Sequence, residues 1–128
     1  MTIPTPDTAH RIQVRPGSQV VRIEIGGEVI AESHRALILE ETRCPIRFYV
    51  PKADVRMERL ERTATHTHCP YKGDAIYWSV RVGDRVVRDA AWSYEEPLPE
   101  RKDIRGHLCF YASRVDAFLV DGEPLARA

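Results

Sequence analysis

Two histidines, a cysteine and a lysine lie within seven consecutive residues of the segment THTHCPYKG, at positions 66, 68, 69 and 72. Imidazole nitrogens and thiolates are zinc ligands, and a thiolate is also a nucleophile. A lysine ammonium binds anions, and it acts as a base where it is desolvated. The same segment also suits one β-hairpin whose polar side chains face water. Each alternative makes a different demand on the surrounding structure.

A zinc site would draw on His66 and His68, together with His107 and Cys109. Residues two apart in a strand share a face, so each pair presents two ligands on one side of its strand. Four such ligands suit tetrahedral zinc only if the two strands are neighbours. Because the chain has no paired CxxC motifs, we predict no metal and keep these four residues as the alternative.

Cys69 is the candidate nucleophile, and Lys72 is the candidate anion hook or base. An ammonium three residues away can stabilise a thiolate, and the histidines just before Cys69 are possible bases. The alternative is that Cys69 is a small hydrophobic residue that closes a strand. Cys44 and Cys109 are interpreted as packing residues. A catalytic role therefore stays a hypothesis for Cys69 and Lys72.

Aromatic residues indicate a small-molecule pocket around the same turn. Tyr77, with Tyr71, Tyr49, Trp92 and Tyr94, could line a pocket in which hydroxyl and indole N–H groups orient a ligand. The alternative is that these aromatics form the core of a small β domain. The predicted ligand-binding residues are Arg47, Tyr49, Cys69, Tyr71, Lys72, Tyr77 and Trp92.

Arg47 has two interpretations. We place it on the strand face opposite Tyr49, either as an exposed charge or as a clamp for a carboxylate. Glu40 and Glu41 precede it on the neighbouring predicted strand. A Glu–Arg pair across the two strands is the ordinary explanation.

The elements that carry these residues are predicted to be β-strands. The run 19–33 alternates apolar and polar residues around Gly26-Gly27, which predicts a hairpin with a tight primed turn. Residues 51–62 are predicted to be a short helix or a loop, and residues 93–106 a long loop. Further strands are expected at residues 35–41, 46–51, 63–68, 75–82, 85–92, 107–112 and 115–122. The fold is therefore mainly β, a compact antiparallel barrel or two-sheet complex of about eight strands with at most one or two short helices.

Length and composition predict one domain. Residues 1–17 are expected to form an N-terminal arm anchored by Ile12 and Val14, and residues 18–128 a single β-rich domain. Nineteen basic and nineteen acidic residues leave no broad basic face, so nucleic acid is not a predicted partner. Three cysteines without CxxC spacing favour a reducing compartment, with the cytoplasm as the expected location. No run of eighteen apolar residues predicts a membrane span.

Five sequence blocks resemble a known family when taken in their order along the chain. They are AESHRALILEE, RFYVPKADV, CPYKGDAIYWSV, AWSYEEPLP and IRGHLCFYASRVDAFLVDG. Over about residues 10–122 the chain resembles domain of unknown function family 427, which implies a mostly β single domain of bacterial and fungal type without an established activity. Such proteins sometimes carry a nucleotidyltransferase label. The sequence shows neither a Gly-Ser pair followed by spaced aspartates for two magnesium ions nor a glycine-rich phosphate loop.

Two classes of function follow, and no cofactor is identified. The first is a small-molecule-binding domain or an undiscovered enzyme with a pocket around CPYKG. The second is a non-enzymatic interaction module whose exposed sheet edges recruit a partner or a second copy, giving a possible homodimer. A pocket that joins Lys72 to the aromatics would favour the first class, and a Lys72 free in solvent would favour the second.

Overall fold

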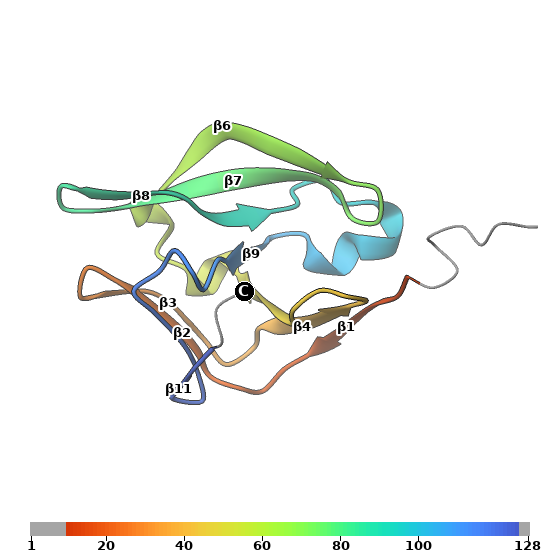
Figure 1. Ribbon diagram of the computed structural model, residues 1–128, viewed down its shortest axis with the longest axis horizontal. Helices are drawn as coiled ribbons and strands as arrows, with labels where there is room; N and C mark the ends of the chain where they lie inside the picture. The colour runs from red at the N-terminus through yellow and green to blue at the C-terminus, as the bar shows by residue number, and fades with distance from the viewer. Residues whose placement is uncertain (1–9, 126–128) are drawn as a thin grey trace, which may run out of the picture.

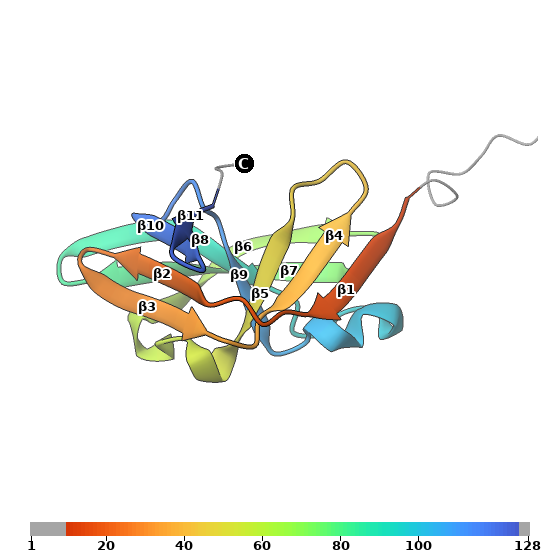
Figure 2. The same cartoon turned by 90° about the horizontal axis from the view of Figure 1, so that it is seen from below.

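The structure is a computed structural model that describes residues 10–125, and it consists of two antiparallel sheets (Figures 1 and 2). In spatial order, the large sheet contains β1 (Ile12–Pro16), β4 (Leu37–Glu41), β5 (Arg47–Pro51), β9 (His107–Phe110), β8 (Arg85–Ser93), β7 (Gly73–Val82) and β6 (Leu60–Cys69). The small sheet contains β11 (Glu123–Pro124), β10 (Ala117–Val120), β2 (Val21–Ile25) and β3 (Glu28–Ser33). The mainly β prediction is confirmed in its two-sheet form, since the described residues form no closed barrel.

The helical content is limited to short 3₁₀ turns within the described residues. They are η1 (Lys52–Asp54), η2 (Met57–Arg59) and η3 (Pro99–Ile104). The first two fall in the segment predicted to be a short helix or a loop. The third, η3, lies within the segment predicted to be a long loop. Its first residue is a proline, which suits the first turn of a helix because a backbone N–H at that position would have no partner within the helix.

The main core lies between the two sheets. Alternation along β2 buries Val21, Ile23 and Ile25 completely, and the facing strands of the large sheet bury Val50 and Leu108. The Gly26-Gly27 hairpin beside this core is confirmed, because the two glycines have φ angles of 60° and 78°. A second hydrophobic cluster lies on the other face of the large sheet.

The second cluster holds most of the aromatic residues singled out in the sequence. Its buried members are Leu39, Tyr49, Ala75, Trp92, Tyr94, Ile104 and Cys109. Figure 1 shows the β6–β7 end and the β1–β4 end of the large sheet one above the other, with the light-blue η3 segment between them at one side. Ile104 of η3 is fully buried in the cluster. The large sheet is therefore curled around its own aromatic face.

Part of the predicted N-terminal arm belongs to this curled sheet. Residues 12–16 form β1, which pairs with β4 from Ile12–Glu41 to Pro16–Leu37. Ile12 and Val14 pack against the second cluster. The first nine residues of the predicted arm lie outside the described residues.

Asp54 links η1 to the end of β3 through side-chain hydrogen bonds. We expect these bonds to contribute stability that is lost in acid. Arg35 donates two hydrogen bonds to its carboxylate, at 2.9 and 3.1 Å, and the Ser33 hydroxyl donates one at 2.7 Å. These bonds, those from Arg35 foremost, lower the pKa of Asp54. Because the folded-state pKa lies below the unfolded value of about 4, the stabilisation is complete above that value and disappears as the pH falls through the folded-state pKa.

We expect Asp54→Asn to lower the free energy of unfolding by about 1 kcal/mol at neutral pH. The difference from the wild-type protein should shrink between pH 5 and pH 3. Urea unfolding of both proteins at several pH values measures this difference. A difference that does not change with pH would contradict the role of the Asp54 charge.

Candidate functional site

The turn between β6 and β7 is held against the opposite end of the large sheet. Lys72 is only 8% exposed, and its Nζ lies 2.5 Å from Oε1 of Glu41 at the end of β4. The second carboxylate oxygen of Glu41 lies 2.9 Å from Nε2 of His10. About nine-tenths of each side chain in the Lys72–Glu41 pair is buried. This ion pair closes the curl of the sheet, and Lys72 is not at a solvated hairpin tip.

The backbone of this turn is also fixed from the other side. The carbonyl of Lys72 accepts a hydrogen bond from the N–H of Leu98 at 2.9 Å, and Gly73 forms an isolated bridge with Pro97. Gly73 has a φ of 115°, which side-chain-bearing residues rarely adopt. A Cβ at this position would stand 3.2 Å from the backbone nitrogen of Leu98, because the segment that contains Leu98 passes close to the turn. Only glycine fits this position without strain.

A cavity of about 210 Å³ opens beside the ion pair, and we call it the Lys72 pocket. Its lining residues are Glu41, Cys44, Arg47, Tyr49, Lys72, Tyr77, Trp92, Tyr94 and Tyr111. Five of the seven predicted ligand-binding residues are in this set, namely Arg47, Tyr49, Lys72, Tyr77 and Trp92. Strands β4, β5, β7 and β8 each supply at least one of the lining side chains.

The predicted position of Arg47 is wrong. Arg47 and Tyr49 are two residues apart on β5, so they point to the same face, and both line the Lys72 pocket. The guanidinium carbon of Arg47 lies 5.1 Å from the centre of the Trp92 ring, within the range of a cation–π contact. The indole Nε1 of Trp92 donates to the hydroxyl of Tyr49 at 3.2 Å, which fixes the ring beneath the guanidinium.

The predicted Glu–Arg pair across β4 and β5 is also wrong. Glu40 pairs instead with Arg15 at 3.0 Å, and Glu41 pairs with Lys72. Among residues 10–125, Arg47 forms no ion pair with a carboxylate. The Lys72 pocket therefore presents a guanidinium whose charge is not balanced by a direct protein partner.

The phenol groups of the pocket act as hydrogen-bond donors at neutral pH. Burial raises the pKa of Tyr49 and of Tyr94 well above the ordinary tyrosine value, and it raises the pKa of Tyr111 to about 12. All three hydroxyls are therefore protonated. Together with Arg47 and Lys72 they make the pocket rich in donors, whereas its one carboxylate, that of Glu41, is already engaged.

The three cysteines differ in their exposure. Cys44 is exposed and lines the Lys72 pocket, so its interpretation as a packing residue is wrong. Cys69 is partly buried against the second cluster and is absent from the pocket lining, although it lies at the end of β6 beside the turn. Cys109 is a packing residue as predicted, and burial raises its thiol pKa to about 12.

This arrangement predicts an order of thiol reactivity. With iodoacetamide at neutral pH, we expect Cys44 to be alkylated first, Cys69 more slowly, and Cys109 only after unfolding, because a buried thiol with a raised pKa forms little thiolate. Peptide mass spectrometry after timed quenching gives the three rates. Faster labelling of Cys69 than of Cys44 would contradict this order and support the hypothesis that Cys69 is a nucleophile.

Tyr71 does not reach the Lys72 pocket. Its ring stacks on the imidazole of His10 with 3.9 Å between the ring centres, on the other side of the turn. Adjacent residues of the turn therefore line different cavities. Lys72 lines the Lys72 pocket, whereas Tyr71 lines a separate hollow on the other side of the turn.

The alternative zinc ligands are not brought together. His66 and His68 lie on β6, whereas His107 and Cys109 lie on β9, and both β7 and β8 separate these strands. The Nδ1 atom of His68 is 2.6 Å from a carboxylate oxygen of Asp74. Within residues 10–125 there is no group of three or more His, Cys, Asp or Glu side chains placed to hold a metal ion.

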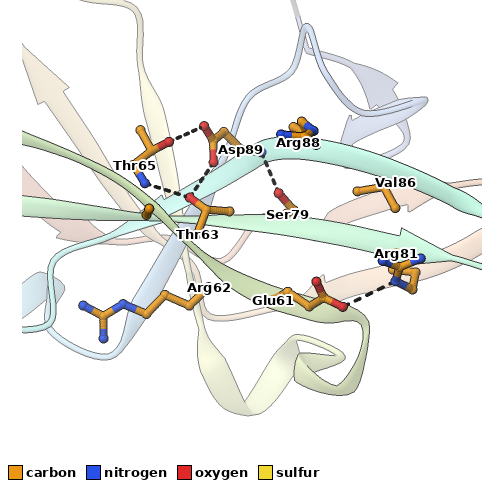
Figure 3. A pocket seen from close by; sticks show the side chains of 10 residues that line it. Glu61, Arg62, Thr63, Thr65, Ser79, Arg81, Val86, Arg88 and Asp89 are labelled. Atoms are coloured by element: carbon orange, nitrogen blue, oxygen red, sulfur yellow. Dashed lines mark hydrogen bonds and ion pairs between the residues drawn. The ribbon is translucent and has the colours of Figure 1, made fainter.

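A larger hollow of about 440 Å³ lies where β6 and β8 both bulge against β7 (Figure 3). The hydroxyls of Thr63 and Thr65 each donate to the Asp89 carboxylate at 2.8 Å, and the Asp89 N–H donates to the Ser79 hydroxyl. These bonds hold Asp89 at a φ of 48°. Figure 3 shows that charged side chains around this hollow already have partners, Asp89 in the two threonines and Arg81 in Glu61. The Lys72 pocket is therefore the better candidate site.

Sequence reasoning missed Cys44 and Tyr111 as pocket residues, and it assigned Glu41 to a different partner. No local pattern marks these residues, because they meet Lys72 only through the curl of the sheet. The described residues include no helix that is long and apolar enough to cross a membrane.

A comparison with protein families identifies the family of this chain. The family model described as a domain of unknown function, DUF427, matches residues 13–121. That span includes all of the residues that line the Lys72 pocket. No curated protein matches the chain.

Proposed function

Because the chain belongs to the DUF427 family, whose description names no activity, we propose its function from the geometry of the Lys72 pocket. We propose that the protein binds a small molecule that carries a carboxylate or another oxyanion. The observation that carries this proposal is Arg47, a guanidinium stacked over Trp92 that faces the pocket without a carboxylate partner among the described residues.

The chemistry of the pocket supports an oxyanion. A guanidinium donates two parallel hydrogen bonds to a carboxylate, and bonds of this kind are stronger than those between neutral groups. Protonated phenols of Tyr49 and Tyr111 add donors, and the carboxylate of Glu41 offers little to a ligand because Lys72 and His10 already occupy it. A ligand rich in acceptors suits such a site better than a cation.

The size of the pocket limits the ligand. Pockets for drug-sized molecules usually measure on the order of 300–1,000 Å³. The Lys72 pocket, with about 210 Å³, lies below this range, although a cavity of about 150 Å³ is enough for benzene. We therefore expect a short acid, or the acidic end of a longer molecule whose remainder lies outside.

The alternative of an interaction module rests on β6. This ten-residue edge strand has mostly exposed side chains, and one of its edges pairs with no strand among the described residues. The burial of Lys72 in a concave site of aromatic residues favours the binding function over this alternative.

The binding function is tested by NMR titration of the ¹⁵N-labelled protein with acetate, malonate and inorganic phosphate. We expect at least one anion to shift the backbone amides of Arg47 and Tyr111, and acetamide to bind at least tenfold more weakly than acetate. Arg47→Met should weaken binding about tenfold or more, since a charge-assisted hydrogen bond contributes about 1.5–3 kcal/mol.

Arg88→Met is the matched control, because Arg88 is an exposed arginine of β8 that lies outside the Lys72 pocket. This variant should bind like the wild-type protein. Equal affinities for acetate and acetamide, or unchanged binding by Arg47→Met, would overturn the proposal.

A further inference from the structure

The turn that carries Lys72 has a second hollow on its other side, with a volume of about 270 Å³. Ile12, Pro70 and Leu98 supply apolar walls, and the stacked rings of His10 and Tyr71 supply a flat aromatic one. None of these residues lines the Lys72 pocket. The two cavities share no lining residue, and the His10–Glu41 contact joins a residue of one lining to a residue of the other.

Arg101 gives this second hollow its polar character. Its Nε donates to the backbone carbonyl of Glu100 at 2.7 Å. Its Nη1 is buried and has no hydrogen-bond acceptor among residues 10–125, although it forms an ion pair with the Asp103 carboxylate at 3.7 Å. Buried donors in native proteins are nearly always satisfied by a hydrogen bond, so this donor calls for an explanation.

The position of Arg101 also sets it apart from an ordinary surface arginine. Its backbone leaves the helical region inside η3, with φ −119° and ψ 23°, so the two turns of η3 meet at this residue. Its side chain is only 19% exposed, whereas the side chain of Arg15 in β1 is 55% exposed. Arg101 is one of the residues that line the hollow, and it is the only one of them with a guanidinium.

We propose that this hollow is a second ligand site, which takes a small monocarboxylic acid with an apolar or aromatic body. The body would lie against Leu98, Ile12 and the Tyr71 ring, and the carboxylate would accept hydrogen bonds from Arg101. Glu100 also lines the hollow, as an exposed side chain, and its negative charge disfavours a ligand with two acidic groups. The proposal does not depend on the function of the Lys72 pocket, because the two sites share no lining residue.

Benzoate and its neutral analogue benzamide are the probes for this site, and NMR titration of the full chain is the measurement. We expect benzoate to shift the amides of Tyr71, Leu98 and Arg101 with a dissociation constant on the order of 1 mM, as suits so small a ligand. Benzamide should bind at least tenfold more weakly, and so should benzoate to the Arg101→Met variant.

Arg105→Met is the matched control, since Arg105 follows η3 directly, is exposed and lies outside the hollow. It should bind benzoate normally, and Leu98→Ser should weaken binding without removing the charge. Shifts confined to the amides of Arg47 and Tyr111 would assign benzoate to the Lys72 pocket and overturn the second site. The proposal would also be overturned if benzamide bound as tightly as benzoate. It would equally be overturned if benzoate did not saturate the site at a concentration a hundredfold above the expected dissociation constant.

Discussion

Replacing Lys72 with methionine is expected to lower the free energy of unfolding by about 3 kcal/mol, because removal of one partner leaves the other charge of a buried ion pair uncompensated. The loss should lie at the lower end of the usual range, since His10 stays beside the Glu41 carboxylate. Urea unfolding followed by tryptophan fluorescence measures the change, and one of the two tryptophans, Trp92, lies in the neighbouring pocket lining.

The double variant Lys72→Met/Glu41→Leu separates a charge effect from a packing effect. If the uncompensated carboxylate is the cause, the second substitution should recover most of the lost stability, as apolar replacements of buried ion pairs often do. A double variant whose loss equals the sum of the two single losses would show that the two residues act independently. That result would contradict the ion pair as the closure of the curled sheet.

Gly73→Ala is expected to lower the free energy of unfolding by about 2 kcal/mol, as is typical of a residue forced into a rarely populated backbone conformation. At a φ of 115° the new Cβ would meet the backbone nitrogen of Leu98 and the Cα of Pro97, neither of which is a flexible side-chain end. The turn should move away from the 94–98 segment and weaken ligand binding in both hollows. Thermal and urea unfolding give the stability change.

Gly83→Ala is the matched control for this substitution. Gly83 also has a positive φ, 59°, but a Cβ there would meet nothing within 4 Å. The control should therefore show only the conformational cost, about 1 kcal/mol. If the two variants are destabilised equally, the close approach of the turn to Leu98 has no energetic importance.

The strands were largely predictable from the sequence, whereas their arrangement was not. Period-two alternation and glycine turns identified the β2–β3 and β7–β8 hairpins, because both signals are local. The pairing of β9 with β5 and β8 joins segments far apart in the chain, and no local pattern specifies it. The bulges in β6 and β8 were also missed, since neither contains a glycine or proline that would mark an irregular strand.

The candidate site was predicted only in part, because local sequence patterns identify some of its residues but do not specify the long-range contacts between them. Tyr49, Tyr77 and Trp92 were identified because aromatic residues with hydroxyl or N–H groups commonly line small-molecule pockets. The correct partner of Lys72 depends on the curl that brings β4 to the β6–β7 turn, and this curl arises from the whole sheet. Arg47 was misplaced although its spacing from Tyr49 already puts the two residues on one face.

The position of β9 in the large sheet has a consequence for synthesis on the ribosome. It is the ninth of eleven described strands in chain order, yet it lies at the centre of the sheet, between β5 and β8 (Figure 2). A nascent chain that has emerged through Ser93 holds the β1–β4–β5 half and the β6–β7–β8 half but lacks the strand that joins them. Until His107–Phe110 emerges, β5 and β8 each present an unpaired edge. The large sheet therefore cannot be completed before His107–Phe110 has emerged, and until then its two halves are open to pairing with other chains.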